Sequence, residues 1–216
     1  MKIERPGDGL RRDARENRER LVASAVKVIA SDGLNVPLAT IAAEAGVGVA
    51  TLYRSFADRD ALMQELELRA YDEIDRILRR IEDAGMTGLP AVHRFLVDTL
   101  AVADRLILPL HGAPPLVDGT ATAARDRIDA ALEAFLQQGR ESAAIASDAN
   151  ATDVIMCSAL ITQPLRHGPD WQRTALRHIA IFTAGLASGR ALPGPPVGRE
   201  DLERTWVERA GLRQVR

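Results

Sequence analysis

The chain contains few of the residues on which most active sites depend. Cys157 is its only cysteine, which excludes an internal disulfide framework, and its four histidines include no pair three or four residues apart. Metal-ligand spacing, a GxSxG elbow and an HExxH helix are all missing from the sequence. We therefore expect no catalysis, no metal ion and no cofactor.

Aromatic residues are also scarce, at 4% of the chain, although hydrophobic residues reach 46%. Alanine and leucine are abundant, and both enter a helix at little entropic cost. The sequence has no strand-like alternation, no apolar run of about 18 residues and no signal peptide. We predict an all-α, cytoplasmic protein with no membrane partner.

Charge is distributed unevenly along the chain. Residues 1–27 hold eight basic and five acidic side chains, a balance of +3, whereas the rest holds 20 basic and 25 acidic side chains, a balance of −5. Arginine supplies 26 of the 28 basic residues, and its guanidinium suits phosphates and guanine edges. A basic leading segment before an acidic body is typical of a head that faces nucleic acid, although a solvated helix of mixed charge is the alternative.

The segment 37–56, PLATIAAEAGVGVATLYRSF, predicts two short helices joined by a glycine turn. A longer helix is expected on either side, the first beginning near Arg11 or Asp13. Such a unit can place its last short helix, residues 49–56, in the major groove of DNA. The segment is therefore the strongest functional signal in the sequence.

Helical periodicity and Pro/Gly punctuation predict the rest of the chain. We expect helices over about 59–83, 89–108, 120–141, 150–163 and 171–188, with a loop at 109–119. A Pro/Gly linker at 192–198 precedes a short tail helix. The expected parts are a mobile arm, a three-helix helix-turn-helix head, a ligand-binding and dimerisation body, and a linker with a tail helix, at residues 1–10, 11–57, 58–190 and 191–216.

The run IAAEAGVGVATLYRSF, preceded by LVASAVKVIASDGL and followed by ADRDAL, resembles the DNA-binding domain of the TetR/AcrR family of bacterial transcription regulators. The resemblance covers about residues 15–70. It departs from the family's common pattern at Gly48, Ser55 and Arg59, where serine, histidine and lysine are frequent. It implies a dimeric regulator, expected to be a repressor, that binds a palindromic double-stranded DNA operator and is released by a small-molecule effector.

The predicted recognition helix offers small groups for base edges and hydroxyl or guanidinium donors for phosphates. Tyr53 taken alone would more often be a core aromatic, and only its place in the motif favours an exposed role. Helix starts favour anions, and the first-helix arginines can follow the DNA backbone. The residues that we expect at DNA are Arg11, Arg12, Arg15, Thr40, Gly48, Val49, Ala50, Thr51, Tyr53, Arg54 and Arg59.

The resemblance also implies an effector pocket in the body, and such pockets are mostly apolar with a few polar groups. The 109–119 loop is the expected gate, and the 59–83 helix is expected to connect the pocket to the head. The candidate lining residues are His93, Phe95, Leu96, Thr99, Leu100, Asp104, Arg105, His111, Leu132 and Phe135.

One head contacts only a few base pairs, so we expect a homodimer with two heads. The helices at 150–163 and 171–188 are apolar on more than one face, which indicates burial against a symmetry mate or in a monomeric core. We expect a four-helix bundle between mates. The candidate interface residues are Val154, Ile155, Ala159, Ile161, Leu176, Ile179, Phe182 and Leu186.

Three other functions stay open at this point. The DNA-binding head is equally compatible with an activator or with a regulator that needs no ligand. A helical interaction module that has lost DNA binding is the third alternative, and the replacements at Gly48 and Ser55 are its only support. No pattern in the sequence indicates the effector or the operator.

Overall fold

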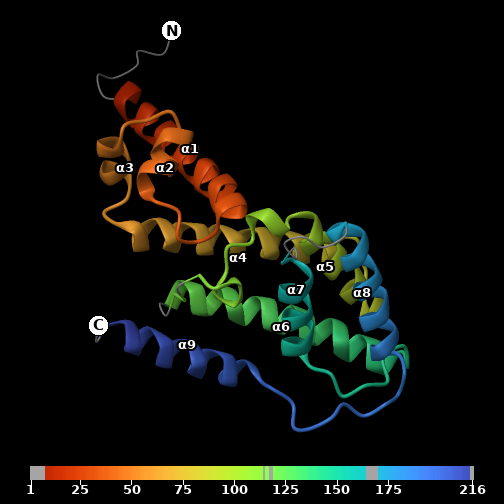
Figure 1. Cartoon of the computed structure of the whole chain (residues 1–216). Helices are drawn as coiled ribbons and strands as arrows, with labels where there is room; N and C mark the ends of the chain where they lie inside the picture. Colours follow the sequence, from red (N-terminus) through yellow and green to blue (C-terminus); the bar gives the residue numbers. More distant parts are fainter. Residues whose placement is uncertain (1–7, 114, 117–118, 164–169, 215–216) are drawn as a thin grey trace.

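A computed structural model describes residues 8–113, 115–116, 119–163 and 170–214, and every regular element in these ranges is helical (Figure 1). The all-α prediction is therefore confirmed. The head consists of α1 (Asp8–Asp32), α2 (Leu38–Glu44) and α3 (Val49–Ser55). The remaining helices are α4 (Arg59–Asp83), α5 (Gly88–Ala101), α6 (Gly119–Glu141), α7 (Ala151–Ile161), α8 (Trp171–Leu186) and α9 (Arg199–Gln214).

Side-chain caps set several of the helix starts. Asp58 accepts a hydrogen bond of 2.8 Å from the Ala61 N–H at the start of α4. Asn150 and Asp153 form a capping box at α7, each side chain accepting a bond from the other residue's backbone N–H. Asp170 caps α8 with a single bond, its side chain accepting from the Arg173 N–H at 3.2 Å. These caps satisfy backbone donors that have no partner inside the helix, which explains why the starts lie close to the predicted positions.

Two hydrophobic clusters stabilise the molecule, one in the head and one in the body. The first part of α4 contributes Leu62 and Leu66 to the head cluster. The later part contributes Ile74, Ile77 and Ile81 to the body cluster. The α4 helix is therefore shared by the two clusters.

The α5 helix ends at Ala101, whereas the sequence predicts a helix to about residue 108. The reason lies in the next segment, where Leu106 is buried in the body cluster and its neighbour Ile107 is buried in the head cluster. Adjacent residues of an α-helix point about 100° apart and cannot face two opposite clusters. The chain therefore continues in two 3₁₀ turns, Ala103–Arg105 and Pro109–His111.

The start of α1 also differs from the sequence-based prediction. The α1 helix begins at Asp8, so residues 8–10 of the expected mobile arm are helical, while residues 1–7 lie outside the described part of the chain. The predicted tail helix is α9, and the linker returns the chain beneath α6, where Arg199 of α9 pairs with Asp126 (Figure 1). None of the described helices has the length and apolar content needed to cross a bilayer.

Candidate nucleic-acid interface and body cavity

The turn between α2 and α3 depends on a glycine. Gly46 has a φ of +66°, in the left-handed region where a side chain would be strained. Its N–H donates to the Ala43 carbonyl and the Val47 N–H donates to the Ala42 carbonyl, each at 3.0 Å. These bonds close α2 and direct the chain into α3 within three residues.

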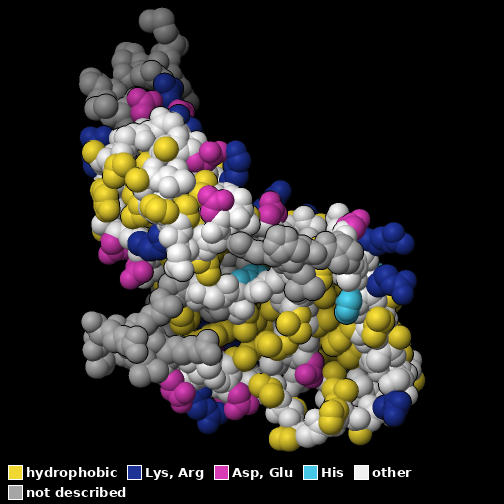
Figure 2. Space-filling view, viewed as in Figure 1, with side chains coloured by type: hydrophobic (Ala, Val, Ile, Leu, Met, Phe, Trp, Pro, Cys, Tyr) yellow, Lys and Arg dark blue, Asp and Glu magenta, His cyan; other side chains and the backbone are white. Residues whose placement is uncertain are grey.

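The two faces of α3 have opposite environments. Leu52 and the following Phe56 are 0% and 2% exposed and belong to the head cluster, whereas Val49 and Tyr53 are 41% and 53% exposed. Ala50 is also exposed. Figure 2 shows hydrophobic side chains gathered on the head where Figure 1 places α2 and α3. Tyr53 is therefore a surface residue rather than a core aromatic.

Hydroxyl and guanidinium groups also lie along α3. Arg54 is exposed, and its Nη2 donates to Thr51 Oγ1 at 2.9 Å. The Ser55 hydroxyl donates to the Thr51 carbonyl at 3.0 Å, so this donor is used within the helix. Gly48 precedes α3 as its N-cap without a side-chain cap, in a conformation open to any residue. The outward face of α3 thus combines small apolar groups with an exposed cation and two hydroxyls.

Arg18 of α1 holds the end of α3 against α4. Its guanidinium donates to the Ser55 carbonyl at 2.5 Å and to the Glu65 carboxylate at 2.7 Å. The same group lies 4.2 Å from the centre of the Phe56 ring. Sequence reasoning missed Arg18. The one sequence feature that could have identified it is its position on α1. Arg18 lies three and four residues before the buried Leu21 and Val22 and therefore shares their face of the helix.

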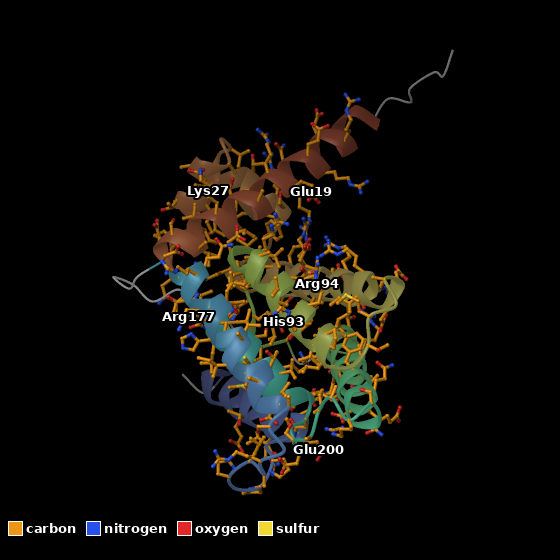
Figure 3. The ribbon with its side chains drawn as sticks, turned by 90° about the vertical axis from the view of Figure 1, so that its right-hand side faces the viewer. Glu19, Lys27, His93, Arg94, Arg177 and Glu200 are labelled. Atoms are coloured by element: carbon orange, nitrogen blue, oxygen red, sulfur yellow. The ribbon has the colours of Figure 1, made fainter. Side chains whose placement is uncertain are left out.

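A second set of ion pairs joins α1 to α4. Arg69 donates to both Glu19 oxygens at 2.6 and 2.8 Å and to Glu65 at 2.8 Å (Figure 3 labels Glu19). The hydrogen bond from Arg69 lowers the pKa of Glu19. Burial opposes ionisation of Glu65, but the bonds from Arg18 and Arg69 outweigh it and lower the pKa of that carboxyl as well. Both carboxylates are charged at neutral pH and fix the angle between the two helices.

Arg59 and Thr40 are placed differently with respect to solvent. The sequence predicts a phosphate contact for Arg59, but its guanidinium donates to the Val36 carbonyl at 2.7 Å and to the Leu34 carbonyl. Arg59 therefore closes the loop between α1 and α2, a role that the motif does not reveal. Thr40 lies exposed in the first turn of α2.

Three candidate arginines lie near the beginning of α1. Arg12 and Arg15 are exposed, and Arg12 Nε lies 3.9 Å from Glu16. Arg11 belongs to α1, but its side chain lies outside the described residues. This end of α1 projects beyond α2 and α3 (Figure 1), so its arginines can reach past the head.

The body contains a mostly apolar cavity of about 80 Å³ between α4, α5, α6, α7 and the segment after α5, with α9 across it. Of the ten residues predicted to line a pocket, the structure places Phe95 and His111 at this cavity. The full lining consists of Tyr71, Ile74, Phe95, Leu106, Leu108, Leu110, His111, Arg125, Ile128, Thr152, Ile155, Ser158, Ala159, Thr162, Arg199, Leu202 and Trp206.

The other eight candidates lie elsewhere. His93 is exposed on α5 (Figure 3), and Asp104 and Arg105 are exposed in the 3₁₀ turn that follows. The remaining five are buried in the core without reaching the cavity: Leu96, Thr99, Leu100, Leu132 and Phe135. Helical periodicity identifies buried positions, but it does not distinguish a filled core from a cavity wall.

The cavity has one polar end, which sequence reasoning missed. The Arg125 side chain is only 9% exposed, and its Nη1 lies 3.8 Å from the fully buried Glu67 carboxylate and donates to the Leu116 carbonyl at 3.0 Å. Glu67 accepts bonds from the Tyr71 hydroxyl at 2.9 Å and from the Leu116 N–H at 3.0 Å. Burial and the Glu67 charge raise the pKa of Tyr71 well above its ordinary value. The sequence feature that could have identified Arg125 as buried is its position, three residues before Ile128 on the same face of α6.

Most of the residues exposed on the outer surface of α7 and α8 are not those predicted for the dimer interface. Four of the predicted residues are buried within the protomer, namely Val154, Ile161, Ile179 and Leu186. Ile155 and Ala159 line the cavity, and Phe182 is half-buried. Leu176 is 45% exposed and is joined on the surface by Met156, Leu160 and Ile181. Figure 3 faces α8 and shows this side of the body, with Arg177 labelled.

Comparison of the sequence with known proteins gives matches that cover part of the chain. The family model of bacterial regulatory proteins of the tetR family matches residues 21–66, from the middle of α1 to the start of α4. An HTH-type transcriptional regulator of Staphylococcus aureus is 36% identical over 75 residues, which cover 34% of this chain and 40% of that protein. The chain thus matches less than half the length of this curated relative.

The similarity of fold extends further along the chain. A TetR transcription regulatory protein from Mycobacterium vanbaalenii is 25% identical, with 82% of this chain and 98% of that chain covered and a TM-score of 0.55. LfrR from Mycobacterium smegmatis, solved in complex with proflavine, shares the fold at 20% identity and a TM-score of 0.59, over 83% of this chain and 99% of that chain. The head of this chain thus matches the tetR family model, and the chain shares its helical fold with solved TetR regulators.

Proposed function

We propose that this chain is a homodimeric transcriptional repressor that binds a palindromic DNA operator through α3 and releases it when a small molecule binds in the body. The observation that carries the proposal is the outward face of α3. Val49 and Tyr53 are 41% and 53% exposed there, although the helix is anchored by the fully buried Leu52. A short helix with one anchored face and one open face is the form in which a recognition helix enters the major groove.

The chemistry of this face suits DNA. Val49 and Ala50 are small enough to approach base edges and thymine methyl groups. The hydroxyls of Thr51 and Tyr53 can donate to phosphate oxygens, and Arg54 can pair with guanine or phosphate. Arg12 and Arg15 would extend the contact along the DNA backbone, and Thr40 would add a phosphate contact at the start of α2.

The α7–α8 surface supports a dimer. Met156 and Leu160 of α7 lie exposed, as do Leu176 and Ile181 of α8, with Leu160 and Ile181 at 68% and 66%. Packing the two helices against those of a mate would remove these side chains from water, which is favourable in proportion to the apolar area buried. A twofold dimer of this kind presents its two recognition helices to half-sites about 34 Å apart or a multiple of that distance.

Two connections link the cavity to the head. Tyr71 and Ile74 of the cavity wall lie on α4, whose first turns are packed in the head cluster. Leu106 lines the cavity while its neighbour Ile107 is buried in the head cluster. A ligand that binds better to the DNA-free arrangement would weaken DNA binding, and a coupling of about 1–3 kcal/mol corresponds to about 5–150-fold.

The test is the double variant Tyr53→Ala plus Arg54→Ala. Two lost contacts of about 1–3 kcal/mol each should reduce operator affinity by at least about 30-fold. The operator is first selected from random DNA, and affinity is measured by fluorescence anisotropy over a salt titration. Because both side chains are exposed, the helical content and sedimentation of the variant should not change. Arg94→Ala, at an exposed position of α5 (Figure 3), is the charge-matched control and should bind like the parent. Unchanged affinity in the double variant would refute the assignment of α3.

A further inference from the structure

The mouth of the body cavity is covered by part of the same chain. Arg199, Leu202 and Trp206 of α9 all line the cavity, and their spacing of three and four residues puts them on one face of that helix. Pockets that take drug-sized molecules usually measure about 300–1,000 Å³. With α9 in place the cavity is about 80 Å³, which is too small for a drug-sized molecule, so part of its wall must move to admit one, and α9 is the part that lies across it.

At the mouth of the cavity, α9 makes the contacts that a bound carboxylic acid with a ring would make. The Glu203 carboxylate lies 3.4 Å from Arg125 Nε, and the Arg125 guanidinium lies 5.3 Å from the centre of the Trp206 ring. A carboxylate and an aromatic ring from α9 therefore approach the same buried guanidinium. The half-buried Leu202 adds an aliphatic group beside them.

The polar groups of the cavity are cationic or neutral. Its described lining includes Arg125, Arg199 and His111, together with several hydroxyls, but no aspartate or glutamate. Glu67, the nearest buried acid, accepts bonds from Tyr71 and Leu116 behind Arg125. Asp126 pairs with Arg199 and Asp129 lies one turn along α6, and neither lines the cavity. If α9 leaves, Arg199 and Glu203 leave together, and the Nε of Arg125 loses its carboxylate partner.

The α9 helix is also built to detach. Leu202 and Trp206 are only half-buried and lie outside the body's hydrophobic cluster. The linker before it is exposed over residues 187–197 and contains three of the chain's prolines. Figure 1 shows α9 beneath α6, reached through this linker. Few apolar contacts and exposed flanks are the properties of segments that open locally while the rest stays folded.

We propose that the cavity binds an apolar, ring-bearing carboxylic acid, and that α9 occupies its mouth as an internal substitute until that acid displaces it. The ligand carboxylate takes the place of Glu203 at Arg125, and its ring takes the place of Trp206. This inference rests on the proposed function for its regulatory meaning, because displacement frees a cavity whose wall includes α4. The binding step itself requires no DNA and is tested without it.

The probe is 4-phenylbutyrate, and 4-phenylbutyramide, which has the same ring and length without the charge, is the matched neutral compound. Calorimetry on the full chain measures binding. In a Trp171→Phe background, the emission of Trp206 reports whether α9 leaves the cavity. Glu203→Gln and Trp206→Ala remove the two competing groups, and Glu200→Gln, an exposed acid at the start of α9 (Figure 3), is the control.

We expect the acid to bind at least about ten-fold more tightly than the amide, since the amide oxygen accepts from the guanidinium without the negative charge that strengthens this bond for a carboxylate. Glu203→Gln and Trp206→Ala should each tighten binding of the acid several-fold, Glu200→Gln should not, and Trp206 emission should shift to the red. Equal affinity for acid and amide, or no binding of either to Glu203→Gln, would overturn the ligand class. Binding without a change in Trp206 emission would overturn the role of α9. Because none of these readouts involves DNA, a failure of operator binding is recognised separately.

Discussion

The head and the body of this protein are stabilised in different ways. The head cluster is formed largely by residues close together in sequence, between Leu21 and Leu66, and its polar groups pair at the surface. The body cluster draws on helices from α4 to α8, encloses a cavity and buries the ion pair of Arg125 with Glu67. A local core suits the proposed role of the head, which is to present one helix to DNA. A core with unfilled space suits the proposed change of the body when a ligand binds.

The two parts are nevertheless connected, and the connection is narrow. The α4 helix contributes to both clusters, and Leu106 and Ile107 face one cluster each. Variants in the head, on the body surface and at the junction between them test how far the two parts depend on each other.

The largest effect is expected at the α7–α8 surface. Leu160→Arg puts a charge into the proposed dimer interface at a side chain that is 68% exposed in the protomer. Burying an unpaired charge is strongly unfavourable, so the variant should sediment as a folded monomer and lose measurable operator binding. Leu192→Arg, at a 45% exposed leucine in the linker, is the matched control and should stay dimeric. A Leu160→Arg dimer would place the interface elsewhere.

The same truncation in the head core and in the body core should have different effects on DNA binding. Leu52→Ala in the head and Leu132→Ala in the body each remove a leucine that is 0% exposed, at a cost of about 3–5 kcal/mol in the free energy of unfolding. Urea titration followed by circular dichroism measures this cost. Leu52→Ala should lower operator affinity strongly and leave the dimer intact, whereas Leu132→Ala should impair DNA binding less. Equal loss of DNA binding in both variants would show that the head and the body unfold as one unit.

Acid should weaken the junction between α1 and α4. The pKa values of Glu19 and Glu65 are lower in the folded chain than the ordinary 4.5, so their ion pairs stabilise the fold above that pH. This contribution disappears as the pH falls through the folded-state values. Arg69→Gln should therefore cost about 0.5–1 kcal/mol at pH 7, a value reduced for solvent exposure. The difference from the parent should shrink as the pH drops below 4.5. A difference that does not depend on pH would exclude these carboxylates as its cause.

The smallest effect is expected at Gly48, before α3. Gly48 has open space where a Cβ would lie, so Gly48→Ser should supply an N-cap hydroxyl to α3 and add a few tenths of a kcal/mol. Gly46→Ser is the control, because its φ of +66° makes a side chain cost about 1–2 kcal/mol. Thermal unfolding compares the two variants with the parent. Equal losses in both would mean that the N-cap site of α3 is not open.

The features of the head that follow local rules are predictable from sequence. Caps, turn glycines and helical spacing set the limits of α2, α3 and α4 to within about two residues. The sequence does not predict the hydrogen bonds that polar side chains make to residues far away in the chain. Nothing in the motif indicates that Arg59 bonds to loop carbonyls or that Arg18 holds the end of α3, since each role depends on where another helix lies.

The body is less predictable because its site is a shape rather than a motif. Periodicity identifies Leu96 and Leu132 as buried, but only the packing of several helices decides that they fill the core while Phe95 borders the cavity. The end of α5 at Ala101 depends in the same way on the two clusters that flank the next segment. The placement of α9 over the cavity follows from the return path of the linker, which composition alone does not indicate.

The central claim, that α3 reads DNA from a twofold dimer, is tested most directly by selecting bound sequences from a random DNA pool with the full chain. The account predicts enrichment of an inverted repeat whose half-sites lie about 34 Å apart or a multiple of that distance. It also predicts that the enriched sequences do not bind the Tyr53→Ala plus Arg54→Ala variant. Enrichment of sites without twofold symmetry, or no enrichment above the unselected pool, would contradict the account.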